Sequence, residues 1–180
     1  MNMDSPLKHH IQFAALDDGI VVLRIVGKGD YEISGQLRAI SDRYSSHGPC
    51  PRYIVDLGNC PSLDSTFMGE IASMALYQRS HRADQLVVVN ANANTRCQMG
   101  KLGLKHILDL RQDSLPEGVC DGAVFQSSAP RPLSRFEQII HMIECHQALI
   151  EADSGNEVRF RGVLQSLQDS LARESAKRKL

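Results

Sequence analysis

Short apolar runs alternate with segments of helical periodicity over residues 11–107, and this alternation restricts the fold more than any other feature of the chain. The strand-like runs, rich in β-branched residues, are 11–16, 20–26, 53–55 and 86–89. Helical spacing follows the second run at Leu37, Ile40 and Tyr44, and it follows the third at Phe67, Ile71 and Ala75. Strands separated by helices need crossover connections, which favour parallel pairing.

The expected fold class is α/β, a mixed sheet with helices packed against it. Residues 11–16 and 20–26 are separated by Asp17, Asp18 and Gly19, which predicts an antiparallel hairpin before the parallel strands. Thr95 and Gln98 form a capping-box pattern and predict the start of a third helix. Two segments, 106–110 and 119–125, are candidates for the last strand.

The pattern changes beyond Pro132, where two amphipathic helices are predicted. The first carries Phe136, Ile139, Ile140 and Ile143 on one face, and residues 153–156 suit a loop between helices. The second has an apolar stripe that we expect to be buried, on the domain or across a homodimer. That stripe consists of Phe160, Val163, Leu164, Leu167 and Leu171.

Composition excludes several classes of protein. Among 180 residues, 20 Lys and Arg oppose 21 Asp and Glu, so overall charge favours neither a nucleic-acid partner nor an anionic membrane. The five cysteines are scattered and form no C-x-x-C pair, which predicts neither a disulfide framework nor a zinc site. No apolar run is long enough to cross a bilayer. We therefore expect a cytoplasmic protein without metal or cofactor.

One segment carries a family resemblance. Residues 53–72 read YIVDLGNCPSLDSTFMGEIA, in which an expected strand ends at Asp56 and an Asp64-Ser65 pair opens a helix. This resembles the signature of the STAS family, which includes the anti-sigma factor antagonists. Gly27-Lys-Gly-Asp30 is similar to the family's turn after the second strand, and residues 92–107 resemble its third helix and the exit from it. The resemblance covers roughly residues 10–127.

The resemblance implies a domain organisation and a function. It implies an N-terminal segment at 1–9, a STAS domain at 10–152 and a C-terminal helical extension at 153–180. It implies a non-enzymatic anti-sigma factor antagonist that binds a serine kinase anti-sigma factor, is phosphorylated on Ser65 by that kinase and is reset by a serine phosphatase. The partner-binding residues would be Asp64, Thr66, Asp30, Asp56 and Phe67. Where the family usually has Gly two residues after the serine, this chain has Phe67, which can face either the core or a partner.

Elementary chemistry agrees that Ser65 suits a switch. A phosphate at a helix N-terminus meets unpaired N–H groups and the positive end of the helix dipole, so the fold should survive it. Its charge of roughly −1.5 to −2 would repel nearby carboxylates and change an interface. Taken alone, Asp64, Ser65 and Thr66 are better explained as an ordinary N-cap cluster.

Other functional groupings have simpler explanations. His141, Cys145 and His146 lie close together on an expected helix, and we interpret them as helix-surface residues rather than metal ligands. Asn90, Asn92 and Asn94 suit loop and cap positions. Neither a phosphate-binding P-loop nor a Gly-x-Ser-x-Gly elbow is present. The alternative to a switch is a constitutive scaffold, such as an accessory subunit of a lipid-transport complex, in which Ser65 is only a cap residue.

Overall fold

The structure is a computed structural model that describes residues 9–16, 18–46, 48–112, 123–129 and 132–178. Its strands are β1 (His10–Ala15), β2 (Ile20–Val26), β3 (Arg52–Asp56), β4 (Leu86–Val89), β5 (Leu108–Leu110) and β6 (Gln126–Ser127). Its α-helices are α1 (Tyr31–Ser45), α2 (Ser65–Ser80), α3 (Ala93–Lys101), α4 (Arg135–Ala152) and α5 (Asn156–Lys177), and a short 3-10 helix, η1, spans Leu104–His106.

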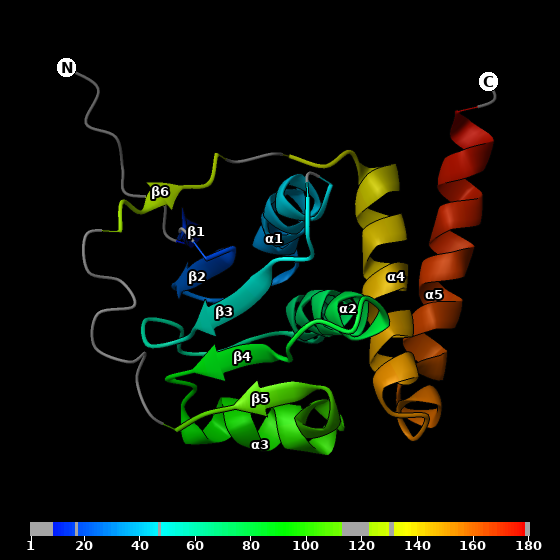
Figure 1. Cartoon of the computed structure of the whole chain (residues 1–180). Helices are drawn as coiled ribbons and strands as arrows, with labels where there is room; N and C mark the ends of the chain where they lie inside the picture. The colour runs from blue at the N-terminus through cyan, green and yellow to red at the C-terminus, as the bar shows by residue number, and fades with distance from the viewer. Residues whose placement is uncertain (1–8, 17, 47, 113–122, 130–131, 179–180) are drawn as a thin grey trace.

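The six strands form one mixed sheet in the order β5-β4-β3-β2-β1-β6 (Figure 1). β1 pairs antiparallel with β2, with His10 opposite Val26 and Ala15 opposite Val21. β2, β3, β4 and β5 then pair in parallel, each return being made through a helical crossover. The expected hairpin followed by parallel strands is confirmed.

The structure also settles several boundaries. β5 lies in the first of the two candidate segments for the last strand, whereas most of the second candidate, 119–125, lies outside the described residues. The sequence did not predict β6, which pairs antiparallel with β1. The start expected for the third helix was wrong: Asn92 is the N-cap of α3, and its side chain accepts a hydrogen bond from the backbone N–H of Thr95.

The core lies between the sheet and the first two helices. α1 and α2 cover one face of the sheet, and α4 lies on their outer side with α5 beyond it (Figure 1). The largest fully buried side chains come from strands and helices alike. They include Leu23, Ile25, Leu37, Tyr53, Phe67, Ile71, Leu86 and Leu149. Burial at this scale is the main stabilising contribution to the fold.

The C-terminal helix pair is packed onto the domain, but less completely than the apolar stripe suggested. Phe160 is buried, whereas Leu164, Leu167 and Leu171 are half-buried and Val163 is exposed. The domain alone therefore buries only part of the stripe, because α5 has α4 on one side only and its remaining circumference faces outward (Figure 1). At the turn before α5, the buried amide of Asn156 donates hydrogen bonds to the carbonyls of Leu102 and Leu149.

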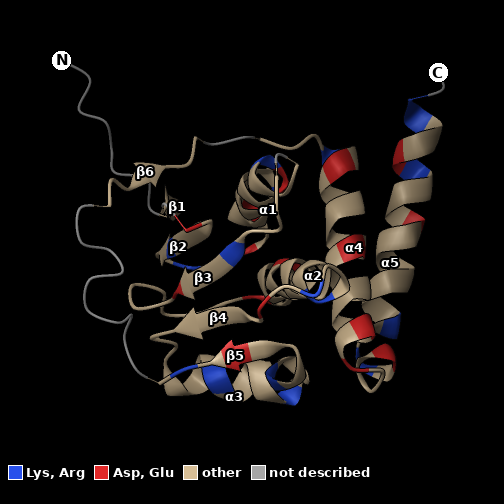
Figure 2. Cartoon of the chain, viewed as in Figure 1, with Lys and Arg blue, Asp and Glu red and all other residues tan. Residues whose placement is uncertain are grey.

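Charged residues lie mainly on the helices. In Figure 2 the charged side chains along α4 are mostly acidic, whereas α5 carries both acidic and basic side chains. Within the described residues, no helix is both long and apolar enough to span a membrane.

Candidate functional site: the N-terminus of α2

Asp64 joins the N-termini of two helices. Its Oδ1 accepts a hydrogen bond of 2.8 Å from the backbone N–H of Phe67 and so caps α2. Its Oδ2 accepts one of 2.8 Å from the backbone N–H of Tyr31, the first residue of α1. Burial raises the pKa of the Asp64 carboxyl, and these N–H donors oppose that rise by stabilising the charged form. Asp64 thus fixes the starts of α1 and α2 relative to each other.

Asp30 lies beside this double cap. Its side chain accepts a hydrogen bond of 3.1 Å from the backbone N–H of Glu32 and caps α1. The preceding residue, Gly29, pairs with the loop before α2 through hydrogen bonds to Ser62 and Asp64. A Cβ at Gly29 would lie 2.4 Å from the Leu63 side chain, which would have to move to admit it. The structure therefore brings Asp30 and Asp64 together at the start of α2.

Ser65 is the first residue of α2 and is half-buried, so it is neither enclosed nor in the middle of the helix. The two residues after it point inward, with Thr66 5% exposed and Phe67 0% exposed. Of the two orientations open to Phe67, the structure has the core-facing one. Both side chains are buried in this conformation, and their role in partner binding stays a prediction.

Asp56 belongs to a different cluster at the end of β3. Its Oδ1 accepts hydrogen bonds from Asn90 Nδ2 at 2.8 Å and from the backbone N–H of Gly58 at 3.0 Å. Its Oδ2 lies 3.3 Å from Nε of Arg24. These contacts hold the ends of β2, β3 and β4 together. Asn90 takes a left-handed backbone with φ of 59°, which agrees with its assignment as a loop residue.

His146 of α4 is a member of the site that the sequence did not identify. Its Nε2 lies 3.1 Å from the Oγ of Ser65, and its ring is 3% exposed. The interpretation of His141, Cys145 and His146 as helix-surface residues was wrong, since all three are buried. α4 is enclosed between α2 and α5, so it lacks the single broad solvent face of an ordinary surface helix. One signal was available: His146 continues the apolar stripe of Ile139 and Ile143 at helical spacing.

A buried polar cluster lies one turn further along α2. Glu70, 2% exposed, accepts hydrogen bonds from Arg38 of α1, whose Nε and Nη2 lie 3.1 and 3.0 Å from Oε2. Arg38 also pairs with Glu144 of α4, and so this ionic cluster joins three helices. Burial raises the pKa of Glu70 and Arg38 opposes it, which is the usual balance for a buried ion pair. The ion pair helps to set the position of α4.

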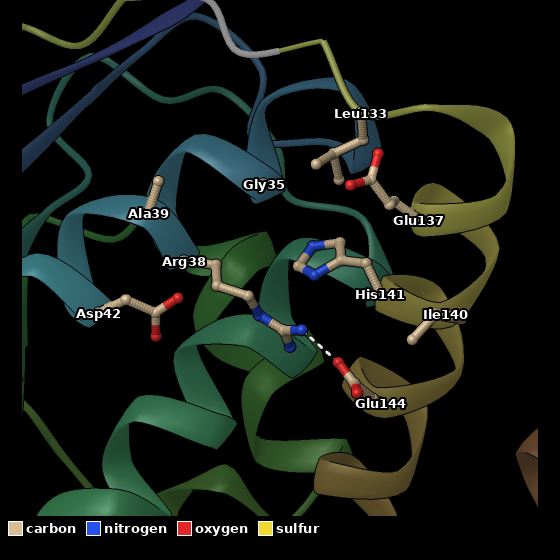
Figure 3. A pocket seen from close by; sticks show the side chains of 9 residues that line it. All are labelled: Gly35, Arg38, Ala39, Asp42, Leu133, Glu137, Ile140, His141 and Glu144. Atoms are coloured by element: carbon tan, nitrogen blue, oxygen red, sulfur yellow. Dashed lines mark hydrogen bonds and ion pairs between the residues drawn. The ribbon is translucent and has the colours of Figure 1, made fainter.

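Figure 3 shows Arg38 and Glu144 of this cluster in a pocket of about 310 Å³ between α1 and α4. The Arg38 side chain crosses the pocket toward Glu144, and the His141 ring lies beside it (Figure 3). His141 Nε2 lies 2.8 Å from the Oγ of Ser34. Burial lowers the pKa of His141 to about 4, so its ring is neutral near neutral pH.

Glu70, His141 and Cys145 are the residues that could hold a metal ion, because one ligand atom of each lies within 4.8 Å of the others. In this arrangement Arg38 already occupies Glu70 Oε2, and burial raises the pKa of the Cys145 thiol far above neutrality. The cluster is therefore explained as the ion pair of Arg38 and Glu70, packed against the neutral thiol of Cys145.

Comparison with known proteins supports the fold. The structure is similar to a Thermotoga maritima protein provisionally assigned as an anti-sigma factor antagonist, with a TM-score of 0.52 and 16% identity over 61% of this chain and 91% of that one. A weaker likeness is to the anti-sigma factor antagonist SpoIIAA in its unphosphorylated form, with a TM-score of 0.48 and 19% identity over 62% of this chain and 96% of that one. Another is to a Shewanella loihica protein with a SpoIIAA-like fold, with a TM-score of 0.45 and 12% identity over 68% of this chain and 100% of that one. No protein-family model and no curated protein matches the chain. The expected mixed α/β fold of the anti-sigma factor antagonists is confirmed.

Proposed function

We propose that this protein is an anti-sigma factor antagonist of the STAS family whose partner binding is controlled by phosphorylation of Ser65. The observation that carries the proposal is the placement of Ser65 as the first, half-buried residue of α2, with Asp64 and Asp30 beside it. A serine in that position can accept a phosphate without breaking the helix, because the N-terminal dipole favours negative charge.

The negative charge would act on binding rather than on folding. In the unmodified protein the edge formed by Asp30, Tyr31 and Ser65 would contact a serine kinase anti-sigma factor, and Tyr31 is 44% exposed there. A phosphate adds roughly −1.5 to −2 charge next to two carboxylates, which makes this edge repel any acidic group of the partner. The kinase would place the phosphate, a serine phosphatase would remove it, and the cycle would run in the cytoplasm without nucleic acid, membrane, metal or cofactor. The protein itself would be a binding partner and not an enzyme.

The test combines detection of the phosphate with a matched pair of variants. Mass spectrometry of the protein from its own cells should find phosphate on Ser65. Ser65→Ala should remove it while costing no more than about 1 kcal/mol of stability, because the carboxylate of Asp64 caps α2 and the serine hydroxyl contributes only one hydrogen bond.

Thr66→Ala is the control, since the Thr66 side chain is buried and should not accept phosphate. Ser65→Glu should fold and bind its partner more weakly than the parent. A Ser65→Glu protein that binds every partner as tightly as the parent would contradict the switch.

A scaffold is the second candidate, and the half-exposed stripe of α5 is the observation that favours it. Val163 is 42% exposed, and Leu164 and Leu167 are only half-buried. A homodimer or a fixed assembly could cover this stripe. Absence of phosphate on Ser65 together with a stable complex through α5 would support the scaffold.

A further inference from the structure

The phosphoacceptor hydroxyl is in contact with a residue from the far end of the domain. Ser65 Oγ lies 3.1 Å from His146 Nε2, across 81 residues of sequence. The contact joins the first turn of α2 to the middle of α4, so the C-terminal helices form one wall of the site.

The second ring nitrogen decides which atom donates in this contact. His146 Nδ1 lies 2.7 Å from the backbone carbonyl of Met142. A carbonyl oxygen can only accept, so Nδ1 carries the hydrogen and, in the neutral ring, Nε2 has a free lone pair. The hydroxyl of Ser65 therefore donates to Nε2.

Two packing contacts fix the ring where it is. The ring of Phe160, from α5, meets the imidazole edge to face with centroids 4.9 Å apart and an interplanar angle of 68°. One turn after Ser65, Gly69 lets α4 approach the backbone of α2 so closely that a Cβ there would lie 2.3 Å from the carbonyl oxygen of Cys145. Neither helix can slide without breaking one of these contacts.

We propose that His146 is the phosphate-binding residue of this site: it accepts from the hydroxyl of unmodified Ser65 and, as an imidazolium, donates to the phosphate of phosphorylated Ser65. The inference rests on the proposed phosphorylation of Ser65. In that step the Ser65 oxygen forms a bond to the γ-phosphorus of a nucleoside triphosphate held by the kinase, a nucleoside diphosphate leaves, and the hydroxyl proton passes to Nε2. The oxygens of a phosphate dianion can only accept, so the ring keeps its contact with them by holding that proton.

The alternative response, departure of α4, is opposed by its packing. α4 buries Ile139, Ile143 and Leu149, and its Glu144 pairs with Arg38. Exposing several such side chains to water carries a large free-energy cost. The phosphate is therefore held within the α2–α4 joint, and the C-terminal helices stay docked in both states.

The experiment uses full-length protein with phosphoserine placed at position 65 by amber suppression, so that no kinase is needed. NMR of the histidine ring nitrogens near neutral pH should show the His146 ring protonated on Nδ1 alone in the unmodified protein and on both nitrogens in the phosphoprotein. Hydrogen exchange of α4 should be no faster in the phosphoprotein. A ring with one proton in both states, or exchange in α4 that speeds up on phosphorylation, overturns the proposal.

Two variants separate phosphate binding from packing. His146→Phe fills the same space without a hydrogen bond, whereas the amide of His146→Gln can still donate to a phosphate. Phosphoserine at position 65 should lower the denaturation midpoint of His146→Phe more than that of the parent, with His146→Gln in between. Equal shifts in all three overturn the inference. If His146→Phe does not fold, the ring NMR of the parent phosphoprotein decides alone.

This test is independent of the proposed function, because the phosphate is supplied during translation. A protein that binds the phosphate through His146 but carries none on Ser65 in its own cells contradicts the proposed switch and leaves the chemistry of the pair standing. Phosphate on Ser65 in cells, with no response of the His146 ring, supports the proposed switch and contradicts phosphate binding by His146.

Discussion

Replacing Gly69 by alanine tests the contact that brings α4 to the site. An added Cβ would lie 2.3 Å from the carbonyl oxygen of Cys145, 2.6 Å from its carbonyl carbon and 2.7 Å from its Cβ. Ordinary contact needs about 3.5 Å, so the two helices must separate by roughly 1 Å. Because the obstructing atoms are mostly backbone, no rotation of a side chain relieves the clash.

The expected magnitude comes from two opposing effects. Overpacking of this kind typically costs about 1–3 kcal/mol. Alanine is the better helix former by roughly 0.5–1 kcal/mol, which offsets part of that cost. Gly69→Ala should therefore lower the free energy of unfolding by about 1–2 kcal/mol, or the melting temperature by about 2–8 °C for a chain of this size.

Chemical denaturation followed by circular dichroism measures this change, and the chain offers its own control. Gly162 is also a helical glycine, but it is exposed on α5 and an added Cβ would meet nothing within 4 Å. Gly162→Ala should stabilise the protein by up to about 1 kcal/mol. Two variants that shift stability in the same direction would refute the backbone contact between α2 and α4.

Two further changes test other parts of the arrangement. Asn156→Ala removes the donor to the carbonyls of Leu102 and Leu149 and should cost about 2–3 kcal/mol in thermal or chemical denaturation, whereas the exposed Asn94→Ala on α3 should cost well under 1 kcal/mol; equal costs would show that the buried amide is dispensable. Burial lowers the pKa of His141 to about 4 from an ordinary value of 6.5, so the unfolded chain binds the proton first as pH falls. The free energy of unfolding should therefore fall between pH 6.5 and 4, by up to about 3 kcal/mol from this residue. A curve of stability against pH that His141→Asn leaves unchanged would refute the buried neutral ring.

The strands β1 to β4, and the start of α2 at Ser65, could be predicted from the sequence because their signals are local. Leu86–Val89 is an apolar run bounded by polar residues, and Asp64 is a strong N-cap residue before a helical pattern. Asp30 and Asp64 were named as candidate partner-binding residues on the strength of the family resemblance, and the structure places both at the start of α2.

The partner of a helix face is not encoded locally, and for this reason the role of His146 was missed. Periodicity identifies the face that carries His146, but the residue it meets lies 81 positions away. The same reason explains why the domain covers the stripe of α5 only in part. Its spacing at Phe160 and Leu164 predicts an apolar face, whereas the degree of burial depends on which neighbours cover that face, and among the described elements α4 is the main one.

The double cap formed by Asp64 can form only in a folded chain, because it joins the starts of two different helices. The two helices that share its carboxylate begin 34 residues apart, and their ends meet when β2 and β3 pair and α1 packs on the sheet. Contacts at such separation form late, since the intervening chain must first lose its freedom. An unfolded or nascent chain therefore contains Ser65 but not the paired helix ends around it. An enzyme that recognises this edge would modify only completed molecules and pass over immature ones.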